Sequence, residues 1–271
     1  MFVIRLRRAV IFTALFLLSC SSDQIRISKA FDLAKKNHYQ ASIIQTSIFP
    51  IQIFYQANKS KHAIIYLEGD GLVINKYGEV AMNSTPTDPM ALRLACADDR
   101  KLTKIVIHRP YHYIKDPNEN SRYWTTARYA PEVIKSIAET IKNCQQEFSF
   151  STMELVAYSG GASVALLLAP YLQNLQRITS FAGNLDHKGW TSYHKTNPLS
   201  ESLDPLENKK ILAEIPQIHF LGTNDANTTV DLGLKYKQKI NSDRVVITPI
   251  DGFEHDSDWP SFWKKQIVKM G

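Results

Sequence analysis

Residues 155–169, which read LVAYSGGASVALLLA, decide the fold of this chain. A short apolar run ends at Ala157, a serine stands among small residues, and a run of Ala and Leu follows, which predicts a strand, a tight turn and a helix. A sharp turn of this kind forces its central residue, here Ser159, to a strained positive φ. Its neighbours must be small, since Cβ atoms beside it would collide with the adjoining strand and helix. The sequence therefore predicts that the Ser159 hydroxyl projects above the carboxyl edge of a sheet.

Short apolar segments alternate with helical patterns on either side of this turn. We predict strands at 63–67, 105–108, 153–157, 178–182, 217–221 and 244–247, and helices at 90–97, 131–145, 161–172, 231–240 and 259–270. Residues 41–56 alternate apolar and polar side chains, as half-buried antiparallel strands do. The later strands show no alternation, which indicates a parallel sheet buried on both faces. The predicted fold is α/β: a mostly parallel central sheet with helices on both faces, in three layers.

One domain, residues 41–271, accounts for all of these elements. Two of its loops, 111–129 and 184–210, are longer than such units need, and both are polar yet rich in aromatic residues. We expect them to line a site. Residues 20–40 are predicted to be an N-terminal tether.

The first 19 residues have a different character. Arg5, Arg7 and Arg8 precede an apolar run over 9–19, which is the pattern of an export signal and is too short to span a membrane. Residues 17–20, LLSC, resemble a bacterial lipobox. The resemblance implies a signal peptide over 1–19 and a lipidated Cys20 that anchors the mature chain, and the serines after it imply the periplasmic side of the outer membrane. An ordinary signal peptide with an incidental Cys20 is the alternative.

Composition excludes some partners. Removing residues 1–19 lowers the formal net charge from +6 to 6 − 3 = +3, because that segment holds three arginines and no acids. No stripe of Lys and Arg with interleaved aromatics is visible, so we expect no nucleic-acid binding. Cys96 and Cys144 have neither CxxC nor CxxH spacing, so we expect no metal. In an oxidising compartment these two cysteines either form a disulfide or remain buried thiols.

The turn at residues 157–161, AYSGG, resembles the G-x-S-x-G motif of the α/β-hydrolase superfamily, with Ala157 in place of the first glycine. With the strand order, the resemblance covers residues 61–270. It implies a serine hydrolase that acts by acyl transfer, most often on esters, without a cofactor. Ser159 would be the nucleophile, since an imidazole and a carboxylate can activate its hydroxyl.

The order of that superfamily, serine then acid then histidine, implies the other two residues. Asp225 follows the strand 217–221 in FLGTND, and His255 follows the last strand in DGFEHD. Asp186 is the alternative acid, because some members take it from the preceding strand. Asp225 is otherwise a turn or N-cap residue, and His255 otherwise a solvated loop residue.

The same resemblance places an oxyanion hole. One backbone N–H would come from Gly160 and the other from the turn EGDGL at 68–72, with Asp70 first and Gly71 second. Glu68 stands where the family often has histidine. Two carboxylates beside a developing oxyanion would raise the barrier unless they were paired. We therefore expect pairing with arginines, for which the candidates are Arg109, Arg122 and Arg128.

The function expected from these residues is hydrolysis of a carboxylic ester of a small acyl substrate. Residues expected to contact substrate are Tyr158, Gly71, Trp124 and Trp190, although packing explains these aromatics equally well. Two alternatives stay open: a membrane-anchored binding lipoprotein without catalysis, and a peptidase, amidase or thioesterase that uses the same three residues. A Ser159 hydroxyl beyond hydrogen-bond reach of His255 would favour the first.

Overall fold

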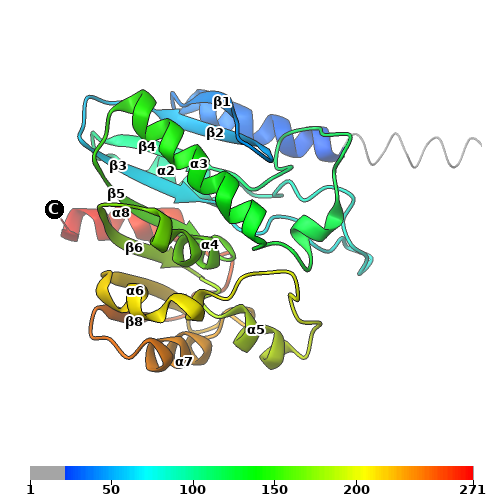
Figure 1. Cartoon of the computed structure of the whole chain (residues 1–271), viewed down its shortest axis with the longest axis vertical. Helices are drawn as coiled ribbons and strands as arrows, with labels where there is room; N and C mark the ends of the chain where they lie inside the picture. The colour runs from blue at the N-terminus through cyan, green and yellow to red at the C-terminus, as the bar shows by residue number, and fades with distance from the viewer. Residues whose placement is uncertain (1–21, 271) are drawn as a thin grey trace, which may run out of the picture.

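The computed structural model describes residues 22–270, which form one eight-stranded sheet in the order β1-β2-β4-β3-β5-β6-β7-β8 (Figure 1). The strands are β1 (Gln40–Gln45), β2 (Pro50–Gln56), β3 (His62–Leu67), β4 (Thr103–Ile107), β5 (Thr152–Tyr158), β6 (Leu175–Phe181), β7 (Gln217–Gly222) and β8 (Val245–Ile250). Strands β1 and β2 pair antiparallel, as do β2 and β4. The remaining strands pair parallel. The predicted opening hairpin and parallel sheet are confirmed.

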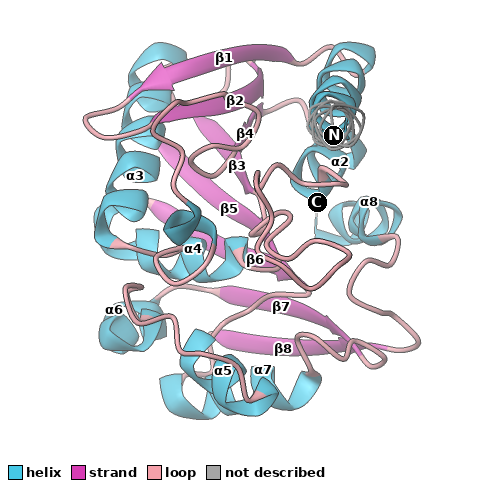
Figure 2. Cartoon of the chain, turned by 90° about the vertical axis from the view of Figure 1, so that its right-hand side faces the viewer, coloured by secondary structure: helices cyan, strands magenta, loops and turns pink. Residues whose placement is uncertain are grey.

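Helices cover both faces of the sheet (Figure 2). They are α2 (Met90–Ala97), α3 (Pro131–Phe148), α4 (Gly161–Leu168), α5 (His187–His194), α6 (Lys209–Glu214), α7 (Val230–Ile240) and α8 (Trp259–Met270), with 3-10 turns η1 (Ser121–Trp124), η2 (Ala169–Tyr171) and η3 (Pro205–Asn208). One apolar core cluster joins the sheet to α3, α4 and α6. A second joins the opposite face to α2 and α8. The three-layer α/β architecture predicted from the sequence is confirmed.

The N-terminal segment differs from the predicted tether. Residues 22–36 are helical, and Ala30 and Ala34 are buried in the second core cluster. Phe31 packs edge to face on Phe54 of β2, with ring centroids 5.1 Å apart. Apolar residues at helical spacing therefore hold this segment on the domain. Within residues 22–270, no helix has both the length and the apolar character that crossing a membrane requires.

The long loops contain short helices that the sequence analysis did not predict. In the 184–210 loop, the Asp186 side chain accepts a hydrogen bond from the Gly189 N–H and caps α5. In the 111–129 loop, Asn120 caps η1 in the same way. Helix α4 is shorter than predicted, because Pro170 allows only a 3-10 turn after Leu168.

The two cysteines of the described chain are unpaired. Cys144, on α3, is buried in the first core cluster, and Cys96, on α2, packs against the second. The sheet lies between these clusters. Of the two alternatives left open by the sequence, the structure supports separate thiols.

Candidate active site

The turn between β5 and α4 has the geometry that its sequence predicts. Ser159 has a φ of +51°, in the left-handed region. A Cβ on Gly160 would lie 2.2 Å from Asp70 Oδ1, and one on Gly161 would lie 2.5 Å from the Leu67 carbonyl oxygen. Ala157, at the position of the missing motif glycine, is fully buried at the end of β5. The turn therefore tolerates a methyl group at its first position and none at the two positions after the serine.

A continuous chain of hydrogen bonds connects Ser159, His255 and Asp225. His255 Nε2 is 3.0 Å from Ser159 Oγ, and His255 Nδ1 is 2.8 Å from Asp225 Oδ2. Because an ionised carboxylate can only accept, Nδ1 carries the proton and Nε2 is left to accept from the serine hydroxyl. Three residues predicted from separate segments of the sequence are thus connected by hydrogen bonds in the order serine, histidine, aspartate.

The Asp225 carboxylate is fixed by the residues that follow it. The backbone N–H groups of Asn227 and Thr228 donate to Oδ1 over 2.7 and 2.9 Å. The Thr228 hydroxyl donates to Oδ2 over 2.7 Å. Burial alone would raise the pKa of Asp225, but the hydrogen bonds from His255 and Thr228 outweigh it and lower the pKa. Asp225 is therefore ionised at neutral pH and positioned to orient the imidazole.

Asn227 and Thr228 also reach His255, and neither contact is predicted from the sequence. Asn227 Nδ2 lies 3.3 Å from His255 Nε2. The Thr228 hydroxyl lies 3.4 Å from Nδ1. The available signal was the run of short polar residues after Asp225, which is typical of a side chain that caps its own turn.

The alternative acid, Asp186, has another role. Its carboxylate caps α5 at Gly189 and pairs with Lys239 over 2.5 Å. His255 contacts Asp225 instead.

The turn after β3 lies against the serine. A Cβ built on Gly69 would be 3.4 Å from Ser159 Cβ, so the backbone of residues 68–71 approaches the nucleophile candidate closely. No hydrogen bond to another group within residues 22–270 is made by the backbone N–H of Asp70 or Gly160. Gly71 has a φ of +72°, and a Cβ there would lie 1.9 Å from the Ser84 carbonyl oxygen. Gly71 is therefore required for the backbone conformation of this turn, where no side chain would fit.

Two arginines neutralise Asp70. Its carboxylate lies 3.2 Å from Arg109 Nη1 and 2.9 Å from Arg128 Nη1, and accepts from the Tyr129 hydroxyl over 3.1 Å. Burial opposes ionisation of Asp70, but the ion pairs with Arg128 and Arg109 prevail and lower its pKa. The third candidate, Arg122, pairs instead with Glu132 and Glu201.

Glu68 differs from what we expected. Within residues 22–270 it pairs with no arginine, and its carboxyl accepts from the backbone N–H groups of Gly69 and Ala91. Complete burial raises its pKa to about 8, against the opposing effect of those two donors. Glu68 is thus mostly protonated at neutral pH, and protonation takes the place of an ion pair.

The aromatic residues expected to contact substrate have mainly structural partners. The Tyr158 hydroxyl donates to the His255 carbonyl over 3.2 Å, so this residue holds the histidine loop. Trp124 is buried and donates to the Ala81 carbonyl. Trp190 donates to Asn227, which places it at the edge of the site. Trp124, which we expected to contact substrate, is therefore a packing residue.

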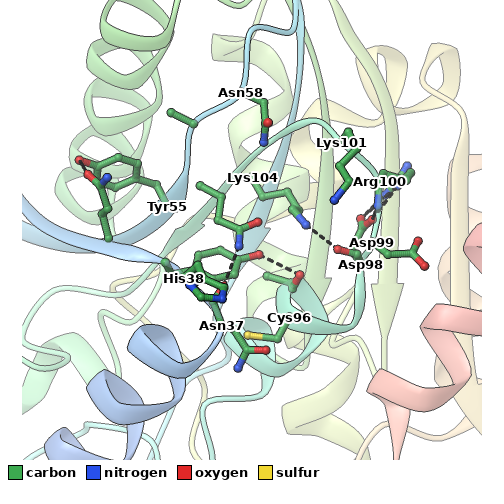
Figure 3. Close-up of a pocket in the computed structure, with 15 residues that line it drawn as sticks. Asn37, His38, Tyr55, Asn58, Cys96, Asp98, Asp99, Arg100, Lys101 and Lys104 are labelled. Atoms are coloured by element: carbon green, nitrogen blue, oxygen red, sulfur yellow. Dashed lines mark hydrogen bonds and ion pairs between the residues drawn. The ribbon is translucent and has the colours of Figure 1, made fainter.

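A polar cleft of about 460 Å³ lies away from these residues (Figure 3). Lys104, near the amino end of β4, lines it, whereas Ser159 follows the carboxyl end of β5. Because β4 and β5 run in the same direction, Lys104 and Ser159 lie at opposite ends of the strands. Several charged groups in the cleft are already engaged: Lys104 donates to the Asp98 carbonyl, and Arg100 pairs with Asp98 and Glu154. The cleft therefore adds nothing to the chemistry at Ser159.

Solved structures similar to this chain share its fold. An esterase from Pyrococcus furiosus is 14% identical with a TM-score of 0.60, over 87% of this chain and 91% of that chain. An α/β serine hydrolase homologue from Coxiella burnetii is 13% identical with a TM-score of 0.58, over 85% and 96%. A carboxylesterase from Bacillus subtilis is 14% identical with a TM-score of 0.57, over 92% and 98%.

By sequence, no family model matches the chain and no curated protein matches it. The structural likeness, the sheet order and the turn at Ser159 together show that the chain has the α/β-hydrolase fold.

Proposed function

We propose that this chain is a serine hydrolase that cleaves a carboxylic ester through an acyl-enzyme. The observation that carries the proposal is the alignment of Ser159, His255 and Asp225 within 3.0 and 2.8 Å of one another. The strained φ of Ser159 and the ionised Asp225 support it, since both are expected of a nucleophile and its orienting acid. Esterases are among the solved structures that share the fold.

In the first step, Ser159 Oγ attacks the ester carbonyl carbon while its proton passes to His255 Nε2. The bond to the alcohol oxygen then breaks, and the imidazolium returns the proton to that oxygen. In the second step, His255 takes a proton from water, the hydroxide attacks the acyl carbon, and Ser159 leaves with the proton restored. Asp225 stabilises the imidazolium in both steps.

The backbone N–H groups of Asp70 and Gly160 are proposed to bind the oxyanion. They belong to the two turns that meet at Ser159, and neither is engaged elsewhere in the described chain. Pairing of Asp70 with Arg109 and Arg128 leaves little net charge to oppose a developing oxyanion.

We also propose that Cys20 is lipidated and holds the enzyme on the periplasmic side of the outer membrane. Cys20 and residues 1–19 lie outside the described residues, so this proposal rests on the sequence LLSC and the basic and apolar segments before it. Mass spectrometry of the N-terminal peptide from native membranes tests it, since a diacylated Cys20 as first residue is expected.

Hydrolysis of p-nitrophenyl esters of graded chain length tests the proposed function. Turnover is expected in the wild-type chain, and Ser159→Ala is expected to lower kcat by about 10⁶-fold. Ser151→Ala is the control, because Ser151 is exposed and lies before β5. It is expected to leave kcat unchanged.

Matched amide and thioester substrates decide the acyl class. Faster turnover of the amide than of the ester, lost in Ser159→Ala, would replace the ester by a peptidase or amidase substrate. A folded wild-type chain that turns over none of the three would favour the binding lipoprotein.

A further inference from the structure

One segment exposes an unusual density of large apolar side chains. We call residues 72–84 the apolar hairpin, because Leu72 donates to the Ser84 carbonyl, Ala81 donates to the Val73 carbonyl, and Ile74 bridges Val80. Its exposed members are Ile74 (49%), Tyr77 (75%), Val80 (46%) and Met82 (71%). Single exposed apolar residues are ordinary, but four within nine residues indicate an interaction surface.

The apolar hairpin lies beside the first described residues of the chain. Arg26, in the helical segment 22–36, donates to the carbonyls of Asn83 and Thr85 over 3.5 and 2.6 Å. The residue before it, Ile25, is itself 64% exposed. Residue 20 is only six positions before Arg26 in the sequence. The described chain begins at residue 22, four positions before Arg26, so its first described residues lie beside the apolar hairpin.

The sequence before this point is suited to a lipid surface. Residues 9–19 are apolar, and LLSC follows. A lipidated Cys20 or a retained apolar segment would both place a bilayer at the same end of the helical segment 22–36. Once the chain is held there, the additional entropic cost of inserting a nearby loop is small.

The tip of the apolar hairpin is suited to the headgroup region. Lys76 lies over the Tyr77 ring, 5.0 Å from its centroid. Tyrosine and lysine both place an apolar body in the acyl boundary and a polar end in the headgroups. The ammonium of Lys76 additionally complements anionic lipids.

The base of the apolar hairpin adjoins the candidate active site. Gly71 immediately precedes it, and Asp70 contacts Gly160 beside Ser159. The helical segment 22–36 (blue) and the loops that follow the parallel strands extend to the same side of the molecule (Figure 1). If the apolar hairpin inserted into a bilayer, the bilayer would therefore face the side of the molecule that carries Ser159.

We propose that the apolar hairpin docks on a lipid bilayer and turns the edge of the sheet that carries Ser159 toward the membrane surface. The orientation relies on the proposed anchor at residue 20, and insertion of the hairpin itself does not depend on hydrolysis.

Quenching of a tryptophan at the hairpin tip tests this proposal in the full chain. Tyr77→Trp is compared with Tyr171→Trp, an exposed tyrosine (58%) that follows α4 at the opposite edge of the sheet. Each protein is reconstituted on vesicles of phosphatidylcholine and phosphatidylglycerol, with or without a spin label near the top of the acyl chain. The emission of the four native tryptophans is measured on the wild-type chain and subtracted.

The expected result is a blue-shifted and quenched emission for Tyr77→Trp, and no change for Tyr171→Trp. The transfer rate between vesicles is expected to rise about tenfold in Tyr77→Ser/Val80→Ser, because two apolar side chains no longer leave water. Tyr171→Ser/Val246→Ser, which changes the same two residue types at exposed positions (58% and 44%), is expected to keep the wild-type rate.

Three results would overturn the proposal. An unquenched Tyr77→Trp would show that the hairpin stays in water or binds a protein. Equal quenching of both tryptophans would show that the chain adsorbs without a preferred face. A blue shift without vesicles that grows with protein concentration would show that a second copy covers the hairpin. None of these readouts uses ester hydrolysis, so failure here leaves the proposed function standing.

Discussion

Asp70 is the single residue on which the electrostatics of the site depend most. Its carboxylate contacts Gly160, directly after Ser159, where a negative charge would oppose the proposed oxyanion. Arg109 and Arg128 neutralise it, and the Tyr129 hydroxyl adds a third donor. This arrangement stabilises a buried carboxylate only while all its partners are present.

Arg128→Met therefore has a large expected effect on stability. Arg128 is nearly buried, and removing it leaves Asp70 incompletely paired, so we expect a loss of about 3 kcal/mol in the free energy of unfolding. Arg122→Met is the matched control, because Arg122 is 40% exposed and its ion pairs are solvated. It should cost less than about 1 kcal/mol. Urea unfolding of both variants measures the difference, and equal losses would contradict this account of Asp70.

The resemblance to the α/β-hydrolase superfamily pointed to Ser159, Asp225 and His255, because that superfamily places each of the three after a strand end in a set order. It did not predict Asn227 and Thr228 as contacts of His255, or the hydrogen bond from Tyr158 to the His255 carbonyl. Tyr158 and His255 are 97 positions apart, and only the folded sheet brings them together. For Glu68 the sequence showed a charge, whereas burial, which the sequence does not show, keeps that carboxyl protonated.

Among the elements, helix α2 depends on Glu68 for its first turn. Pro89, at the N-cap position, makes no side-chain cap, and the Glu68 carboxyl accepts from the Ala91 N–H in its place. Burial keeps the folded-state pKa of Glu68 near 8, well above its value of about 4.3 in an unfolded chain. The stability of this element is therefore linked to pH.

The sign of that linkage gives a prediction. Between about pH 4 and about pH 8 the folded state binds more protons than the unfolded state at Glu68, so the free energy of unfolding falls as pH rises, by up to about 1.4 kcal/mol per pH unit. Glu68→Gln should remove this slope. Unfolding in urea at several pH values measures it, with the exposed Glu79→Gln as control. A Glu68→Gln protein with the wild-type slope would show that Glu68 is ionised when folded.

Most elements were predictable because their cores are continuous apolar runs. The predicted helix at 90–97 matches α2, and the predicted strands lie within three residues of the observed ones. The helical segment 22–36 was missed because its buried face includes small alanines, Ala30 and Ala34, among many charges. Helices α5 and α6 were missed because they are short and depend on capping and tertiary contacts.

In the molecule as a whole, the sheet separates two apolar cores, and the candidate active site lies at the carboxyl ends of its parallel strands. Cys144 and Cys96 belong to opposite cores, and burial raises the pKa of each thiol to about 12. Such thiols are poor nucleophiles. Cys144 is buried, whereas Cys96 is half-buried and lines the polar cleft.

We therefore expect no disulfide, even in chain purified from an oxidising compartment. Without reductant, Cys144 should react with a maleimide only after denaturation, and Cys96 should react slowly in the folded chain and fully after denaturation. Dithiothreitol should leave the melting temperature unchanged. Mass spectrometry of the alkylated peptides shows which cysteines have reacted. Recovery of a peptide that joins Cys96 to Cys144 would contradict the placement of these residues on opposite faces of the sheet.

Fluorophosphonate labelling of the folded full-length chain, with the adduct located by mass spectrometry, shows whether Ser159 is an activated nucleophile. We expect one adduct, on Ser159, that is absent in Ser159→Ala and forms much more slowly in His255→Ala, since the imidazole takes the proton from the hydroxyl over 3.0 Å. An unlabelled Ser159 in folded protein, or an adduct on another serine that persists in Ser159→Ala, would contradict it.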